Sequence, residues 1–229
     1  MPAAYAEAFD LADAEEHARI VLERGSEVAR VVVWRSLPSG GAILCVVTDD
    51  RPGLVALVTS AFLAHALDVR AAQIYCRTRP DGRLEAVDFF WLRNSAGPAA
   101  VDPTRLDACG ATISQLVTLQ NGAAETPGLD VCADAAASVS YSPDETIAEA
   151  WDVRLEARDF PGLLHTVARL LHQHGLEVLR CEIRTEEGMA RDRFIVTSFN
   201  GKPAPEQLPP FRTALLGIIT ARASTAPPS

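Results

Sequence analysis

The sequence has almost no lysine, and this shortage excludes two classes of cofactor site. Lys202 is the only lysine in 229 residues, and it lies in the proline-rich stretch GKPAPEQLPP. A phosphate-binding P-loop needs Gly-Lys-Ser or Gly-Lys-Thr, and a pyridoxal phosphate enzyme needs an enclosed lysine for its Schiff base. The chain meets neither requirement, and we expect it to carry no cofactor.

Positive charge, closely spaced cysteines and long apolar runs are also scarce. The net charge of −9 argues against general binding to nucleic acid or to a membrane surface. No apolar run approaches the length of a membrane span, and the acidic start lacks the apolar centre of a signal peptide. An odd number of scattered cysteines favours reduced, buried thiols in a cytoplasmic protein. The five are Cys45, Cys76, Cys109, Cys132 and Cys181.

A five-residue pattern occurs twice in the chain. The stretch DRPGL covers 50–54, and DFPGL covers 159–163. The offset of 109 (159 − 50) also carries Ile74 onto Ile183, and an offset of 104 (192 − 88) aligns VDFFWL with RDRFIV. Repetition on this scale indicates duplicated domains and not a solenoid of small units.

Hydrophobic periodicity predicts the same order of elements in both halves. Each half reads strand, helix, strand, strand, helix, and the first half adds a strand at 136–141 to give βαββαβ. This is the ferredoxin-like order. We therefore predict an α+β fold with two such modules in tandem, their antiparallel sheets carrying helices on one face.

The pattern also predicts the domain limits. Residues 1–38 form an N-terminal helix and strand, and the first and second modules cover 39–142 and 148–222. An irregular insertion lies at about 120–134, and 223–229 form a disordered tail.

Two further expectations concern the N-terminal segment. In its helix, over about 11–24, the apolar stripe consists of Ala14, Ala18, Val21 and Leu22. We expect the strand at 27–35 to pair into the sheet and fill an edge, because the second half has no strand after its last helix.

The repeated loop joins a strand to a helix and has the chemistry of an anion site. Asp50 can cap the helix, Pro52 suits the first turn, and Gly53 lets a ligand approach the backbone. Free N–H groups at the helix start favour a small anion such as an amino-acid carboxylate. A single copy is most simply an ordinary strand-to-helix turn. Two copies in the same frame favour a ligand site.

These stretches resemble ACT domains, which are small regulatory modules that bind amino acids. The resemblance lies in the D-x-P-G-L loops, in Ala71, Ile74 and Thr78 of the following strand, and in the pattern beginning at Asp88. The second copy matches at Ile183, Thr185, Asp192, Phe194 and Val196. The pair is most similar to the tandem at the C-terminus of bacterial PII-protein uridylyltransferase/uridylyl-removing enzymes, which act in nitrogen regulation. The chain has no His-Asp dipeptide, so the resemblance implies a sensor without the catalytic domains.

The resemblance implies a small amino acid as ligand, with glutamine the first candidate. Backbone N–H groups near Gly53 and Gly162 would hold its carboxylate. Gln73 and its counterpart Glu182 would contact the amino group or the side chain, although both could equally be exposed strand residues. The expected ligand-binding residues are Asp50, Arg51, Pro52, Gly53, Leu54, Gln73 and Ile74 in the first copy, and Asp159, Phe160, Pro161, Gly162, Leu163, Glu182 and Ile183 in the second.

Other sites and functions receive less support from the sequence. His172 and His174 are two residues apart, whereas metal ligands on one helix face prefer a spacing of three or four. His165 is expected at the surface or at a pocket rim. We expect a non-enzymatic sensor that signals to a protein partner and has the capacity to form a homodimer. The alternatives are a degenerate uridylyltransferase-like protein and a structural dimerisation module without a ligand.

Overall fold

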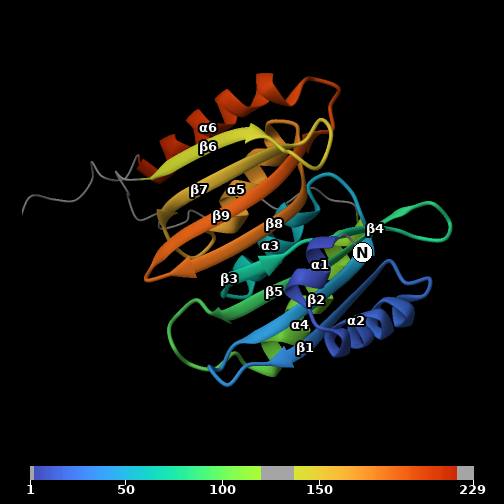
Figure 1. Cartoon of the computed structure of the whole chain (residues 1–229). Helices are drawn as coiled ribbons and strands as arrows, with labels where there is room; N and C mark the ends of the chain where they lie inside the picture. Colours follow the sequence, from blue (N-terminus) through green and yellow to red (C-terminus); the bar gives the residue numbers. More distant parts are fainter. Residues whose placement is uncertain (1–2, 120–136, 221–229) are drawn as a thin grey trace, which may run out of the picture.

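The computed structural model describes residues 3–119 and 137–220, which form helices packed on one antiparallel sheet (Figure 1). The helices are α1 (Ala3–Ala8), α2 (Leu11–Arg24), α3 (Leu54–Ala64), α4 (Pro103–Leu119), α5 (Leu163–Gln173) and α6 (Ala204–Thr220). The strands are β1 (Ala29–Ser36), β2 (Ala42–Asp49), β3 (Leu67–Gln73), β4 (Cys76–Thr78), β5 (Leu84–Asn94), β6 (Ser138–Pro143), β7 (Trp151–Arg158), β8 (Leu176–Glu186) and β9 (Met189–Ser198). The expected insertion at 120–134 and the expected tail at 223–229 lie outside the described residues.

The two halves share one sheet instead of forming two separate ones. Its strand order is β1-β2-β5-β3-β8-β9-β7-β6, with β4 paired to β5. The halves meet where β3 pairs with β8, and there Gln73 faces its own repeat counterpart Glu182 (73 + 109 = 182). A pseudo-twofold axis therefore passes between β3 and β8 and exchanges the two halves.

Each half has the ferredoxin-like strand order, but its edge strand comes from the preceding segment of chain. The N-terminal strand β1 pairs with β2 and fills an edge, as predicted. The strand expected to close the first module at 136–141 is β6, and that expectation was wrong, because β6 pairs with β7 of the second half. The free side of β2 is already occupied by β1, so its hydrogen-bonding groups are not available to β6.

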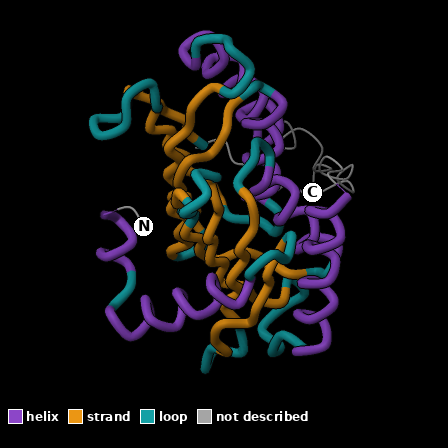
Figure 2. The backbone as a smooth tube through the Cα atoms, turned by 90° about the vertical axis from the view of Figure 1, so that its right-hand side faces the viewer, coloured by secondary structure: helices purple, strands orange, loops and turns teal. Residues whose placement is uncertain are grey.

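Helices cover both faces of the sheet, as the edge-on view shows (Figure 2). One face carries α3 to α6, and the apolar core beneath them includes Leu44 and Phe62 from the first half and Leu155 and Leu171 from the second. The other face carries α1 and α2 over the first half only, where Phe89 and Val87 are buried. None of the helices in the described residues is long and apolar enough to cross a membrane.

The face that α2 buries agrees only in part with the predicted stripe, because Ala14 and Val21 pack against the core whereas Ala18 is exposed. Leu22 is 79% exposed, whereas His17, Ile20 and Arg24 point inward. The Arg24 guanidinium donates hydrogen bonds to the carboxylates of Glu85 and Asp49, which lie on β5 and β2. A buried charge needs partners, and these two carboxylates hold the helix in an orientation that hydrophobicity alone would not select.

We predict that the two halves unfold together, because they share a sheet and a core. The chain has three tryptophans: Trp34 and Trp91 in the first half and Trp151 in the second. A Trp151→Phe variant reports only on the first half, and a Trp34→Phe, Trp91→Phe variant reports only on the second. Urea unfolding followed by fluorescence should give coincident midpoints for both variants, matching circular dichroism. Two separated midpoints would show independent domains.

The end of α3 stores backbone strain that a glycine would relieve. Ala66 has φ of +51°, and the equivalent residue after α5 is Gly175 with φ of +76°. A left-handed conformation costs an alanine roughly 1 kcal/mol or more. We therefore expect Ala66→Gly to raise the free energy of unfolding by about 0.5–1 kcal/mol in urea titrations. The matched Gly175→Ala change should lower it, because its Cβ would collide with Asn200 and Gln207. A lower stability for Ala66→Gly would contradict this account.

Candidate functional site

The repeated loops connect β2 to α3 and β7 to α5 with the same backbone. The residue before each helix is a glycine with positive φ, +82° at Gly53 and +89° at Gly162. This region of backbone conformation favours glycine over other residues. A Cβ at Gly53 would also lie 2.8 Å from Nδ1 of His172, so the glycine lets the second half pack closely against the loop.

The expected capping by aspartate is not observed. No side chain caps α3 or α5, and Gly53 and Gly162 occupy the N-cap positions. Asp159 is instead hydrogen-bonded to Arg70 at 2.9 Å. The prolines lie before the helices and not in their first turns, since α3 begins at Leu54 and α5 at Leu163.

Two cavities lie at the junction of the halves, and the pseudo-twofold axis relates them. The first is bounded by the 50–54 loop and by the beginning of β8, and the second by the 159–163 loop and the beginning of β3. Each cavity therefore needs both halves. The matching lining residues are Asp50 and Asp159, Gly53 and Gly162, Leu54 and Leu163, Ile74 and Ile183, Asp88 and Asp192, and Glu177 and Asp68.

Both cavities are too narrow for an amino acid. The first encloses about 20 Å³ and the second about 10 Å³. One water molecule needs roughly 10 to 15 Å³ on the same measure. An amino acid therefore enters either cavity only if the surrounding loop or strand moves.

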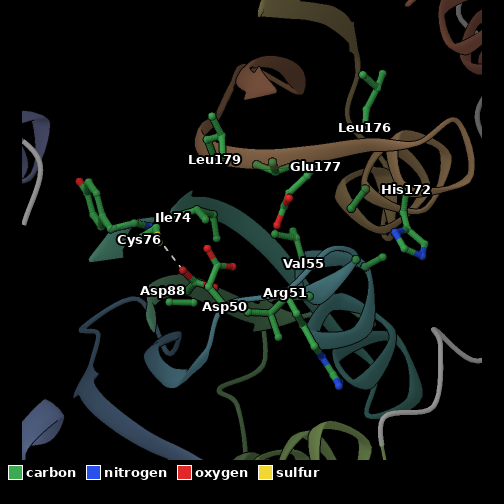
Figure 3. A pocket seen from close by; sticks show the side chains of 17 residues that line it. Asp50, Arg51, Val55, Ile74, Cys76, Asp88, His172, Leu176, Glu177 and Leu179 are labelled. Atoms are coloured by element: carbon green, nitrogen blue, oxygen red, sulfur yellow. Dashed lines mark hydrogen bonds between the residues drawn. The ribbon is translucent and has the colours of Figure 1, made fainter. Parts of the chain in front are cut away.

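Three carboxyl groups gather around the first cavity (Figure 3). Asp88 is fully buried, its Oδ1 accepts the Tyr75 backbone N–H at 3.4 Å, and its Oδ2 has no hydrogen-bond partner. Burial, followed by the charge of Asp50, raises the pKa of Asp88 well above its ordinary value. The same two causes raise the pKa of Glu177 to about 7. The site therefore holds one fully buried carboxyl group, Asp88, and two that are half-buried, Asp50 and Glu177.

The second cavity has an equivalent set of carboxyl groups, but arginines neutralise part of it. Burial raises the pKa of Asp192 to about 8. Burial and the charge of Asp68 raise the pKa of Asp159, and Arg70 and Arg93 oppose that effect. Arg93 contacts Asp68 at 2.6 Å. The two cavities thus share a shape and differ in charge.

Not all of the expected site residues line the cavities. Those that do are Asp50, Arg51, Gly53, Leu54 and Ile74 around the first, and Asp159, Phe160, Gly162, Leu163 and Ile183 around the second.

Of the other expected residues, Gln73 and Glu182 face each other across the β3–β8 ladder, and neither is among the described residues lining a cavity. Pro52 and Pro161 are likewise outside both linings. The Arg51 side chain extends away from the carboxyl groups in Figure 3. The predicted loops and the predicted strand residues Ile74 and Ile183 thus lie at the cavities, and the ligand contacts of Gln73 and Glu182 stay a prediction.

The sequence analysis did not assign site roles to Asp88, Glu177, Asp68 and Asp192. Asp88 interrupts the apolar run AVDFFWL, a signal that marks a buried carboxyl group, and the repeat aligns Asp192 with it. Glu177 and Asp68 carry no such signal. Each begins a strand of one half and reaches the cavity of the other only through the β3–β8 pairing.

The histidines are structural in their contacts. His165, expected at the surface or at a pocket rim, is buried and lines the second cavity, and its Nδ1 lies 3.2 Å from the carbonyl oxygen of Ala56 and 3.1 Å from Thr59 Oγ1. Burial lowers its pKa to about 4. His172 stacks on Phe199. Across the described residues, no group of three or more His, Cys, Asp or Glu side chains is arranged to hold a metal ion.

The described cysteines are free thiols. Cys45, Cys109 and Cys181 are buried, and Cys76 is half-buried beside the first cavity. Burial is the largest cause that raises the pKa of all four. They are therefore protonated thiols near neutral pH. Cys132 lies outside the described residues.

The raised pKa of Asp192 predicts a stability that falls as the pH rises. The folded state holds a proton up to about pH 8, whereas the unfolded aspartate loses it near 3.8. The contribution is full below pH 3.8 and is lost toward pH 8, with a slope of up to about 1.4 kcal/mol per pH unit. Asp192→Asn should therefore reduce the decline in unfolding free energy between pH 6.5 and 8, measured by urea titration.

The comparison of the variant with the parent separates Asp192 from the buried histidines. His17 and His165 have pKa values of about 4 in the folded state and about 6.5 in the unfolded state, so they add the same rising contribution to the unfolding free energy of both proteins. The exposed Asp107→Asn change is the matched control and should leave the slope as in the parent protein. An unchanged slope in Asp192→Asn would mean that Asp192 is already ionised at pH 6.5.

The chain is similar to bifunctional uridylyltransferase/uridylyl-removing enzymes along nearly its full length. It is 26% identical to the bifunctional uridylyltransferase/uridylyl-removing enzyme of Gluconobacter oxydans and 27% identical to that of Phenylobacterium zucineum, over 96% and 99% of the chain. These matches cover 24% of each relative, so the chain spans about a quarter of their length. No family model matches the chain.

Two further comparisons are more limited. An ACT domain-containing protein of Arabidopsis thaliana is 37% identical over 60 residues, which cover 26% of the chain and 14% of that protein. A crystal structure of an unknown protein from Galdieria sulphuraria covers 78% of the chain and 90% of its own, with 16% identity and a TM-score of 0.26, too low to support an argument. The chain thus resembles, over nearly all its length, part of bacterial uridylyltransferase/uridylyl-removing enzymes and, over a shorter stretch, an ACT-domain protein.

Proposed function

We propose that the chain is a non-catalytic regulatory module that binds a small amino acid where the repeated loops meet the opposite half, and that it signals to a protein partner. The observation that carries the proposal is the pair of symmetry-related cavities, each formed by a D-x-P-G-L loop, a helix start and a strand of the other half. The similarity to an ACT domain-containing protein supports it.

The proposed ligand contacts follow from charge. The first turn of a helix has N–H groups without intrahelical acceptors, and these suit a carboxylate. The Leu54 N–H already donates to the Arg51 carbonyl, and the Leu163 N–H to the Phe160 carbonyl. The carboxylate therefore relies on the other N–H groups around Gly53 and Gly162, and the buried carboxyl groups face the ligand's ammonium. Glutamine remains the first candidate, because the resemblance implies it.

The small size of the cavities suggests how ligand binding is transmitted to a partner. A ligand must separate the 50–54 loop from the beginning of β8, and these segments belong to different halves. The helices α3 and α5 pack against each other across the same junction. Binding would therefore shift one half against the other and change any surface that spans both, which couples the ligand to a partner site.

The proposal includes a location and excludes a catalytic role. Free, protonated thiols fit a reducing compartment, so we propose a cytoplasmic protein. The carboxyl groups of the cavities lie beside no activated nucleophile among the described residues, because the nearby Cys76 has a raised pKa of about 12. We therefore assign the cavities to binding and not to uridylyl transfer.

A dimerisation role without a ligand is the second candidate. The sheet ends at β1 and β6, each of which pairs with a neighbouring strand on one side only. Such edges can pair with a second copy of the chain.

A thermal-shift screen against the twenty amino acids tests the proposal. A ligand at a hundred times its dissociation constant stabilises the folded state by about 2.7 kcal/mol, which corresponds to a rise of roughly 5 to 10 °C in Tm for a chain of this size. We expect such a rise with glutamine. Hydrogen exchange should then show added protection in peptides covering 50–58 or 159–167.

The screen also separates the two candidates. A Tm rise with protection elsewhere would place the site outside the loops. No rise with any amino acid would favour the dimerisation module, and sedimentation equilibrium would then decide whether the chain self-associates.

A further inference from the structure

The two cavities differ in the cations that pair with their carboxyl groups. Around the second, Arg70 Nη1 lies 2.9 Å from Asp159 Oδ2, and Arg93 lies 2.6 Å from Asp68 and 3.7 Å from Asp159. These arginines provide cations for two of its three carboxyl groups. Two carboxyl groups of the second cavity are therefore paired without any ligand, whereas Oδ1 of the buried Asp192, like Oδ2 of Asp88 in the first cavity, has no hydrogen-bond partner among the described residues.

The first cavity has no such cations. Within the described residues, no Arg, Lys or His side chain forms an ion pair with Asp50, Asp88 or Glu177. By the repeat offsets, Leu179 replaces Arg70 (70 + 109 = 179), and Thr197 replaces Arg93 (93 + 104 = 197). In the described part of the chain, the carboxyl groups of the first cavity thus lack the paired cations that the second cavity has.

The unpaired carboxyl oxygen of Asp88 in the first cavity indicates that a ligand supplies the missing hydrogen-bond donor. Asp88 is fully buried and lines the cavity, and its Oδ2 has no hydrogen-bond partner. A buried oxygen of this kind costs about 1–3 kcal/mol unless a donor reaches it. Figure 3 shows the carboxyl groups of Asp88, Asp50 and Glu177 around one space, with Arg51 and His172 directed elsewhere.

The local backbone is the same at Arg70 and Leu179, the equivalent positions at which the two cavities differ in charge. Both β3 and β8 have an irregularity in their pairing, between Val69 and Ala71 and between Val178 and Arg180. The residues at these irregularities are Arg70 and Leu179. Because the strand presents both side chains in the same local setting, the charge difference comes from the side chain alone.

We propose that only the first cavity receives the protonated amine of a ligand, with Asp88, Asp50 and Glu177 as its acceptors, and that at the second cavity the ion pairs of Arg70 and Arg93 with Asp159 and Asp68 take the place of such an amine. This inference rests on the proposed function and makes it specific, since the chain then binds one ligand and not two. The described residues offer no metal-type arrangement here, so a primary ammonium group with several donors fits better than a divalent ion.

The test is a nuclear magnetic resonance titration of the full chain with two probes, L-glutamine and n-propylammonium. The Tyr75 amide, which donates to Asp88, reports on the first cavity. The Arg184 amide, its counterpart (75 + 109 = 184), interacts with Asp192 and reports on the second. We expect the Tyr75 signal to move with saturation and the Arg184 signal to stay.

Two variants locate the amine. Asp88→Asn keeps the size of the side chain and removes its capacity for negative charge, and Leu179→Arg introduces at the first cavity the counterpart of the arginine that pairs with Asp159 beside the second. Each should weaken glutamine binding at least tenfold while its Tm confirms folding. The symmetric control Asp192→Asn should leave the affinity unchanged.

The outcomes separate this inference from the proposed function. Movement of Arg184, a stoichiometry of two, or loss of binding in Asp192→Asn would overturn the inference and leave the amino-acid sensor in place. Binding of n-propylammonium at Tyr75 without binding of any amino acid would support the amine site and remove the sensor. No response at Tyr75 to either probe at millimolar concentration would overturn the inference.

Discussion

The pairing of β3 with β8 is the constraint on which the rest of the structure depends. It joins two four-strand arrangements into one sheet, and it places Gln73 against Glu182 at the pseudo-twofold axis. It also brings α3 beside α5, where His165 contacts its own counterpart Ala56. Without this ladder, each repeated loop would face solvent on the side where it now meets the other half.

The same pairing explains why a duplicated sequence yields two unequal sites. Each cavity takes its loop from one half and a strand beginning from the other, so Glu177 serves the first and Asp68 the second. Duplication preserves the shape because backbone conformation, glycine positions and strand irregularities repeat. Charge is not preserved, because Arg70 and Leu179 are free to differ at equivalent positions without disturbing the backbone.

The N-terminal helices α1 and α2 have no counterpart among the described residues of the second half, because only the first half has an apolar face for them to cover. The first half presents Phe89 and Val87 on the face opposite to α3 and α4, and α1 and α2 cover them. On the same face of β7 in the second half, Arg154 and Glu156 are exposed and need no cover. A polar strand face is stable in water, whereas an apolar one is buried against another element.

By itself, the sequence determined nearly every described helix and strand, the α+β class, and the loops that border the cavities, because periodicity and glycine placement are local properties. It also carried the Asp88–Asp192 alignment. Only the tertiary structure decided that β6 crosses to the second half, that Arg24 turns inward, and that Glu177 and Asp68 reach the cavities. Those outcomes depend on which hydrogen-bonding edges are free and on which charges meet across about 60 to 90 residues of chain, and no local pattern encodes them.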